Sequence, residues 1–312
     1  MLQTFDYKNG IHAVDIGYER PLMVAVHLVV DSGRVAIIDA GHNRGLEAVL
    51  RAMERQGLSK ESVDYLCLTH VHLDHAGGAG RYMQAFPNAQ LVVHERGARH
   101  MINPGKLIAG AREVYGDAET ERRYGELVPV SEDRVMIAHD GERLRFGRRE
   151  LICLDTPGHA KHHLCYHDPA ARGVFTGDVF GSSFRELDVG ERQFVIPISS
   201  PVQFDPLAMH ASIERILALE PEAVYLTHFS QLRDPKTAAA DLHRLIDAYV
   251  DVTKRAEGSY PAILDGLWAL YDEEAKRQGW TLSREAVREM LRMEMEINAQ
   301  GLEVWFKSQA KA

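Results

Sequence analysis

The segment Thr69-His70-Val71-His72-Leu73-Asp74-His75-Ala76-Gly77-Gly78 places three histidines and one aspartate within six positions, directly after an apolar run. Side chains two residues apart in an extended strand point to the same side, so His70 and His72 can bind one ion together. A turn into a helix at Asp74 would bring its carboxylate and the His75 ring to a second point nearby. The spacing therefore predicts two adjacent metal sites at the end of a buried strand.

Four further segments carry an aspartate or histidine at the end of an apolar or turn-forming stretch, in a fixed order around the first. One precedes it, at residues 37–41 (IIDAG), and three follow it, at 156–159 (TPGH), 176–178 (TGD) and 226–228 (LTH). Together with the His-x-His-x-Asp-His spacing, these segments resemble the metallo-β-lactamase superfamily. The resemblance covers roughly residues 10–235. It implies an α/β fold, the αββα sandwich, with ligands on loops at one edge.

The resemblance also implies a set of metal ligands shared between two sites. The first metal is bound by His70, His72 and His159, the second by Asp74, His75 and His228, and Asp178 bridges the two. Asp74 and Asp178 are the expected catalytic carboxylates. Two other residues, Asp39 and His163, are expected to support the site without binding metal, since a carboxylate behind a ligand can orient its imidazole ring.

The ligand chemistry indicates hydrolysis without a side-chain nucleophile. Imidazole and carboxylate ligands suit zinc, iron or manganese and do not choose strongly among them, so we expect two divalent ions, zinc first, with iron or manganese as alternatives. Two ions about 3.5–4 Å apart can share a water, lower its pKa, and hold the resulting hydroxide against a bound electrophile. A binuclear metal-dependent hydrolase follows from this combination.

The substrate class rests on the resemblance alone. The site resembles those of glyoxalase II and related thioesterases, of lactonases, and of a phosphodiesterase branch. We expect a small carboxylic ester, thioester or lactone, with phosphodiester hydrolysis as the alternative in the same fold. Two alternatives of other classes use the same ligands. One is a di-iron redox or oxygen-binding protein, and the other is a regulatory protein whose helical tail seals the site.

Composition limits the partners and the compartment. The 312 residues carry a formal net charge of −9, whereas proteins that bind nucleic-acid phosphates usually present a basic face. The three cysteines, Cys67, Cys153 and Cys165, lie in apolar runs, as buried thiols of a reducing compartment do. We find neither a signal-peptide pattern at the start nor an apolar run of about 18 residues. We expect a cytoplasmic protein with a small-molecule substrate and neither a nucleic-acid nor a membrane partner.

The chain changes character after residue 235. Strand-like runs and helical periodicity alternate up to that point, and three long helices are expected beyond it, at 237–254, 260–278 and 283–306. We therefore divide the chain into a catalytic domain of metallo-β-lactamase fold, residues 1–235, and a C-terminal helical extension, residues 236–312. The extension is expected to form a lid over the site or a homodimer interface.

Two irregular segments are candidates for contacts outside the ligand set. Residues 103–135 are charged and interrupted by glycine, which fits either a lid or a solvated connector. Residues 181–206 form a long loop that directly follows Asp178 and must therefore start at the metals. The candidate substrate contacts in this loop are Phe184, Arg185 and Phe194.

Overall fold

The computed structural model describes residues 3–309, and these divide into two compact units. The first unit consists of the chain up to residue 155 together with 162–177 and 224–231. The second unit consists of 156–161, 178–223 and the chain from residue 232 onward. The helices beyond residue 235 therefore share a compact unit with the loop that follows Asp178. The division into domains 1–235 and 236–312 stays a prediction.

The first unit contains a seven-stranded sheet in the order β1-β2-β3-β4-β5-β6-β7. The strands up to β4 pair antiparallel, and β4 to β7 pair parallel. Their bounds are Thr4–Asp6 (β1), Ile11–Asp15 (β2), Ala25–Asp31 (β3), Arg34–Ile38 (β4), Val63–Cys67 (β5), Gln90–His94 (β6) and Val135–Ala138 (β7). Parallel neighbours require crossover connections, and helices supply them. These are α1 (Leu46–Arg55), α2 (Leu73–Ala76), α3 (Ala79–Ala85), α4 (Glu95–Ile102), α5 (Gly105–Tyr115) and α6 (Asp117–Tyr124).

A six-stranded sheet in the order β13-β12-β11-β10-β9-β8 follows in the chain. Its strands are β8 (Arg143–Phe146), β9 (Arg149–Asp155), β10 (Leu164–Asp168), β11 (Gly173–Gly177), β12 (Ala223–Leu226) and β13 (Ser230–Leu232). Buried side chains of the two sheets meet, as the His27 ring of β3 does with the Phe175 ring of β11, at 5.4 Å between centroids. The first unit is therefore a two-sheet sandwich, as expected from the sequence.

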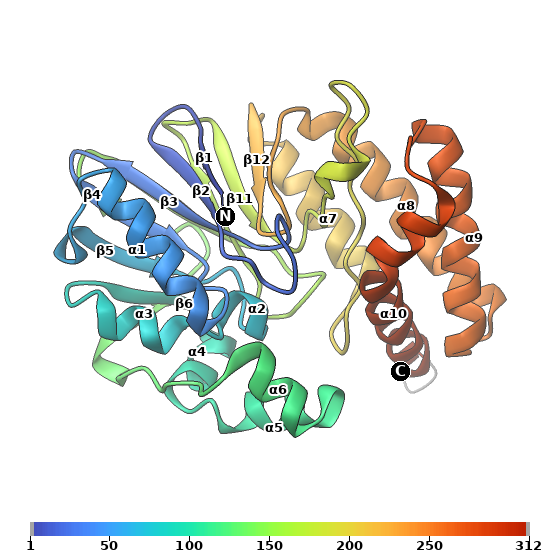
Figure 1. The fold of residues 1–312 in the computed structure, drawn as a ribbon, viewed down its shortest axis with the longest axis horizontal. Helices are drawn as coiled ribbons and strands as arrows, with labels where there is room; N and C mark the ends of the chain where they lie inside the picture. Colours follow the sequence, from blue (N-terminus) through green and yellow to red (C-terminus); the bar gives the residue numbers. More distant parts are fainter. Residues whose placement is uncertain (1–2, 310–312) are drawn as a thin grey trace. The chain divides into compact units, whose positions relative to one another are not determined.

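The second unit contains α7 (Pro206–Leu217), α8 (Pro235–Arg255), α9 (Tyr260–Gln278) and α10 (Arg284–Gln309). Helix α7 packs against α8, α8 against α9, and α10 against both α9 and α8 (Figure 1). The expected helix at 260–278 is confirmed at both ends, and those at 237–254 and 283–306 are each longer in the structure. Asp205 and Asp234 cap α7 and α8, and a proline follows each cap. Such a pair is typical of a helix start because proline has no N–H to leave unsatisfied. No helix within residues 3–309 is long and apolar enough to cross a bilayer.

Asn298 of α10 ties the long loop of the second unit to the helices. Its side-chain oxygen accepts from the Ser199 backbone N–H at 2.7 Å, and its side-chain nitrogen donates to the Pro197 carbonyl at 3.1 Å. Asn298 and Ser199 are buried. Gly301, one turn further along α10, has no side chain because a Cβ atom there would collide with the Ser199 carbonyl oxygen.

Replacing Asn298 by alanine is expected to lower the free energy of unfolding by about 2–4 kcal/mol, because a buried donor and a buried acceptor lose their partners. Urea denaturation followed by circular dichroism measures the change. Glu296→Ala, at an exposed position of the same helix, is the control. A loss no larger than in this control would show that the Asn298 contacts do not hold the loop.

Candidate metal centre

The local fold around the histidine-rich segment follows its sequence. β5 ends at Cys67, and His72 retains an extended backbone, with φ −64° and ψ 149°, directly before α2 begins at Leu73. His70 and His72 therefore precede the helix, and Asp74 and His75 lie in its first turn, as predicted. The following glycines permit close packing, since a Cβ atom at Gly78 would lie 2.6 Å from the Ala40 carbonyl oxygen.

Asp74, His75 and His228 bring three ligand atoms together within the first unit. The Nε2 atoms of His75 and His228 are 3.2 Å apart. The Asp74 Oδ2 atom lies 3.7 Å from the first and 3.4 Å from the second. Donors around a tetrahedral zinc ion, at bond lengths of 2.0–2.1 Å, lie about 3.3–3.5 Å from one another. The three atoms therefore fit one metal ion of this size.

Hydrogen bonds behind the two imidazole rings fix which nitrogen faces that point. The His75 Nδ1–H donates to Asp39 Oδ2 at 2.9 Å, and the His228 Nδ1–H donates to the Met23 carbonyl oxygen at 2.9 Å. An ionised carboxylate and a carbonyl can only accept, so each Nδ1 carries the proton and each Nε2 presents its lone pair. This is the arrangement usual behind metal-binding histidines.

The Asp39 carboxylate connects three separate segments of the first unit. Besides the His75 ring, it accepts from the Thr69 backbone N–H at 2.8 Å and from the Thr227 hydroxyl at 2.8 Å. Asp39 is fully buried and has a positive φ of 60°. The structure thus places Asp39 directly behind the His75 ring, and its supporting role at a metal site stays a prediction.

His70 and His72 form a second group of ring nitrogens in the first unit. The His70 Nε2 atom lies 2.9 Å from the His72 Nδ1 atom. The His163 ring stacks on the His70 ring at 5.2 Å between centroids. His162 was not predicted to have a special role, but its ring lies 5.8 Å from that of His72. Burial lowers the pKa of His162 to about 3, so this ring is neutral.

His159 and Asp178 lie in the second unit and are close to each other. The His159 Nε2 atom is 3.4 Å from the Asp178 Oδ2 atom. The His159 Nδ1–H donates to the Ile198 carbonyl oxygen at 3.2 Å, so its Nε2 presents a lone pair. Asp178 directly follows Gly177, the last residue of β11, and His159 lies a few residues beyond β9.

The candidate substrate contacts have other partners in the second unit. The Phe194 ring is 2% exposed and packs 4.9 Å from the Trp280 ring and 6.4 Å from the Tyr271 ring. Phe184 is buried. The Arg185 guanidinium lies 3.4 Å from the Asp188 carboxylate. The structure thus gives Phe194 a packing role in the helical unit, and the substrate contacts stay predictions.

Two tyrosines near Asp74 were not singled out by the sequence. The hydroxyl groups of Tyr18 and Tyr124 are 2.9 Å apart and buried. Burial and the negative charge of Asp74 raise the pKa of Tyr18 above its usual value. Tyr124 is the last residue of α6, which lies within the 103–135 segment, so this helix end contacts Tyr18. A lid motion of the segment stays a prediction.

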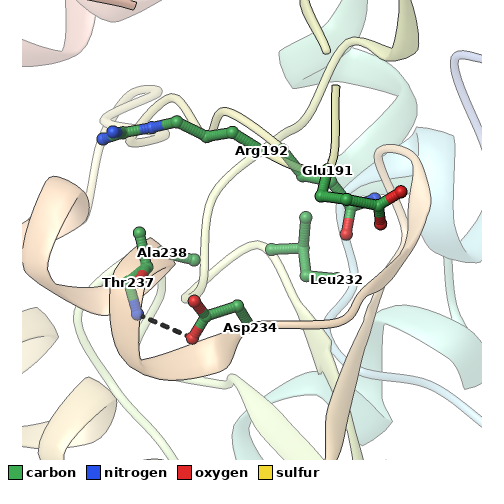
Figure 2. A pocket seen from close by; sticks show the side chains of 7 residues that line it. Glu191, Arg192, Leu232, Asp234, Thr237 and Ala238 are labelled. Carbon is green, nitrogen blue, oxygen red and sulfur yellow. Dashed lines mark hydrogen bonds between the residues drawn. The ribbon is translucent and has the colours of Figure 1, made fainter. Parts of the chain in front are cut away.

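A pocket of about 290 Å³ in the second unit differs from the candidate metal centre in its lining residues. It lies at the start of α8, where Asp234 accepts from the Thr237 backbone N–H at 3.1 Å (Figure 2). Its Arg192 guanidinium lies 2.9 Å from the Asp241 carboxylate. The lining contains no histidine and therefore does not offer the ligand chemistry found at Asp74.

The sequence profile of the Metallo-beta-lactamase superfamily matches residues 20–228, the stretch that contains every candidate ligand described above. The chain belongs to this superfamily. Its solved relative ST1585, an archaeal superfamily protein, has a TM-score of 0.62 and covers 76% of this chain and 86% of its own. The superfamily fold predicted from the sequence, with its C-terminal helices, is confirmed.

Curated members of the superfamily are similar to this chain at low identity. The Metallo-beta-lactamase fold-containing protein ST1585 of Sulfurisphaera tokodaii is 27% identical over 243 residues, 76% of this chain and 85% of that protein. The Hydroxyacylglutathione hydrolase of Fuscovulum blasticum is 27% identical over 259 residues, 81% and 76% of the two chains. The Acyl-coenzyme A thioesterase MBLAC2 of Gallus gallus is 30% identical over 175 residues, 52% and 59%.

Replacing Asp39 by asparagine is expected to weaken metal binding at the His75 site by about 10–100-fold, because the amide no longer fixes the Nδ1 proton of His75 with a charged acceptor. Competition with a chromophoric chelator measures the affinity. The control is Asp6→Asn, which changes another aspartate bonded to a histidine, His12, at 2.7 Å. Equal affinities in the Asp39 variant and the wild type would contradict the orienting role.

Proposed function

We propose that this protein is a binuclear metal-dependent hydrolase of small carboxylic esters, thioesters or lactones, with zinc as the metal. The observation that carries the proposal is the convergence of the Asp74, His75 and His228 ligand atoms, each imidazole being held by a hydrogen bond from behind. Membership of the superfamily supports metal-dependent hydrolysis in general. The ester or thioester bond, the identity of the metal and the number of ions are parts of the proposal.

We propose that the pairs His70–His72 and His159–Asp178 complete the ligand set: His70, His72 and His159 would bind the first metal, and Asp178 would bridge it to the second, which Asp74, His75 and His228 would bind. Each of these pairs is already close within its own unit. The sequence order of these ligands resembles that of the superfamily, as described above.

The protein's own groups would hold and orient the reacting system. Such a centre, when loaded, lowers the pKa of a water and polarises the group under attack. The Asp74 carboxylate, and that of Asp178 in the proposed pairing, would balance the positive charge of the ions. The Tyr18 hydroxyl keeps its proton at neutral pH, since the pKa of a tyrosine is about 10 even when unperturbed and burial and Asp74 raise that of Tyr18 further. It can therefore act as a hydrogen-bond donor beside Asp74 without adding a negative charge.

Two relatives support the choice of bond. One is a hydroxyacylglutathione hydrolase and the other an acyl-coenzyme A thioesterase. The net charge of −9 disfavours long polyanionic substrates such as nucleic acids. We also propose a cytoplasmic location, supported by three buried cysteines that form no disulfide. A role for the C-terminal helices as a lid or a homodimer interface belongs to the same proposal.

Protein purified without added metal is expected to contain two zinc ions per chain by elemental analysis and to hydrolyse members of an ester, thioester and lactone panel. His228→Ala is expected to lower kcat/KM by more than about 100-fold, because a metal centre supplies several kcal/mol of transition-state stabilisation. His139→Ala changes an exposed histidine and is the control.

Other outcomes would replace the proposal. Hydrolysis restricted to phosphodiesters would assign the phosphodiesterase alternative. Two iron ions with visible absorption, and no turnover of any panel member, would indicate redox or oxygen chemistry. Less than one metal ion per chain, not restored by reconstitution, would contradict a binuclear centre.

A further inference from the structure

Two histidines outside the metal centre meet between neighbouring helices of the second unit. His210 lies on α7 and His243 on α8. Their rings are nearly parallel, at an interplanar angle of 17° and 4.8 Å between centroids. Their Nδ1 atoms are 2.6 Å apart. Neither residue belongs to the ligand set described above.

A carboxylate from the opposite helix holds the far side of each ring. The His210 Nε2 atom lies 3.2 Å from Asp247 Oδ1 of α8. The His243 Nε2 atom lies 2.8 Å from Glu214 Oε1 of α7. Each helix thus supplies one histidine and, four residues later on the same face, one carboxylate. The result is a crossed arrangement in which both rings are oriented from behind.

The two carboxylates determine where the ring protons are. An ionised carboxylate has only acceptor oxygens, so each Nε2 must carry the hydrogen of its ring. In the neutral ring the remaining nitrogen, Nδ1, then presents a lone pair. Two lone pairs that face each other at 2.6 Å repel. The pair therefore requires a Lewis acid between the rings, either a shared proton or a metal ion.

We propose that His210 and His243 bind a divalent transition-metal ion of the zinc class through their Nδ1 atoms. A carboxylate–histidine–metal sequence on both sides is the usual environment of such ligands. Two nitrogens on a tetrahedral zinc ion lie about 3.3–3.4 Å apart, so the rings need to separate by less than about 1 Å. Both side chains are a quarter exposed, which leaves room for this movement and for water as further ligands.

Such an ion would link α7 to α8 in addition to their packing. A ligand that binds only the folded state stabilises that state, so the bound ion would stabilise the packing of α7 against α8. The proposal stands on these two helices alone and does not depend on the proposed hydrolase function.

The test uses the full-length protein as purified, dialysed against excess zinc and then against a zinc-buffered solution. The wild type is expected to retain about one zinc ion per chain more than His210→Ala or His243→Ala. Asp247→Asn and Glu214→Gln are expected to bind the extra ion about 10–100-fold more weakly, because the rings lose their charged acceptors. Circular dichroism spectra verify that the variants are folded.

His12→Ala is the matched control, because His12 is also paired with a carboxylate, that of Asp6, at 2.7 Å. Its zinc content is expected to equal that of the wild type. In addition, ¹⁵N chemical shifts of the imidazole rings distinguish coordination at Nδ1 from coordination at Nε2. Equal zinc content in the wild type and both histidine variants, or a wild-type pair that shows only one shared proton, would overturn the proposal.

Discussion

The candidate metal centre depends on the hydrogen bonds accepted by the buried carboxylate of Asp39. Thr69 immediately precedes the histidine-rich segment, Thr227 immediately precedes His228, and His75 is itself a proposed ligand. All three donate to this one side chain. Two distant parts of the chain, around residues 69–75 and at Thr227, are thereby held against one charge. A buried carboxylate is stable only when its lone pairs are used, so the bonds that satisfy Asp39 also position the ligands.

The same chemistry recurs at the helix pair of the second unit. At His75 a carboxylate fixes the proton on Nδ1 and turns Nε2 toward the site. At His210 and His243, carboxylates fix the protons on Nε2 and turn the Nδ1 atoms toward each other. In both places the acceptor behind the ring decides which nitrogen can bind an ion. Groups that are not themselves proposed ligands therefore set the direction of the imidazole lone pair.

The sequence predicted those parts of the site that depend on local order. The spacing of the histidine-rich segment predicted a helix start at Asp74, and Asp74 and His75 do lie in the first turn of α2. The long-range contacts had no such signal. Tyr18 and Tyr124 are 106 positions apart, and Phe194 meets Trp280 across 86 positions, counted from their numbers. Pairings of this kind arise from tertiary packing, which a periodicity in one segment does not reveal.

His210 and His243 show most clearly which contacts the sequence could not predict. Each histidine has a carboxylate four residues later on its own helix, which the sequence shows. The carboxylate that it actually contacts lies on the opposite helix, and only the fold brings the two together. The proposed catalytic ligands also come from distant segments. His159 and Asp178 lie in the unit that contains these helices, and the others lie in the first unit. Unfolded chains rarely hold a preformed site, so binding of an ion to ligands from distant segments adds to folding stability. Metal content and stability should therefore be coupled in this protein at both places.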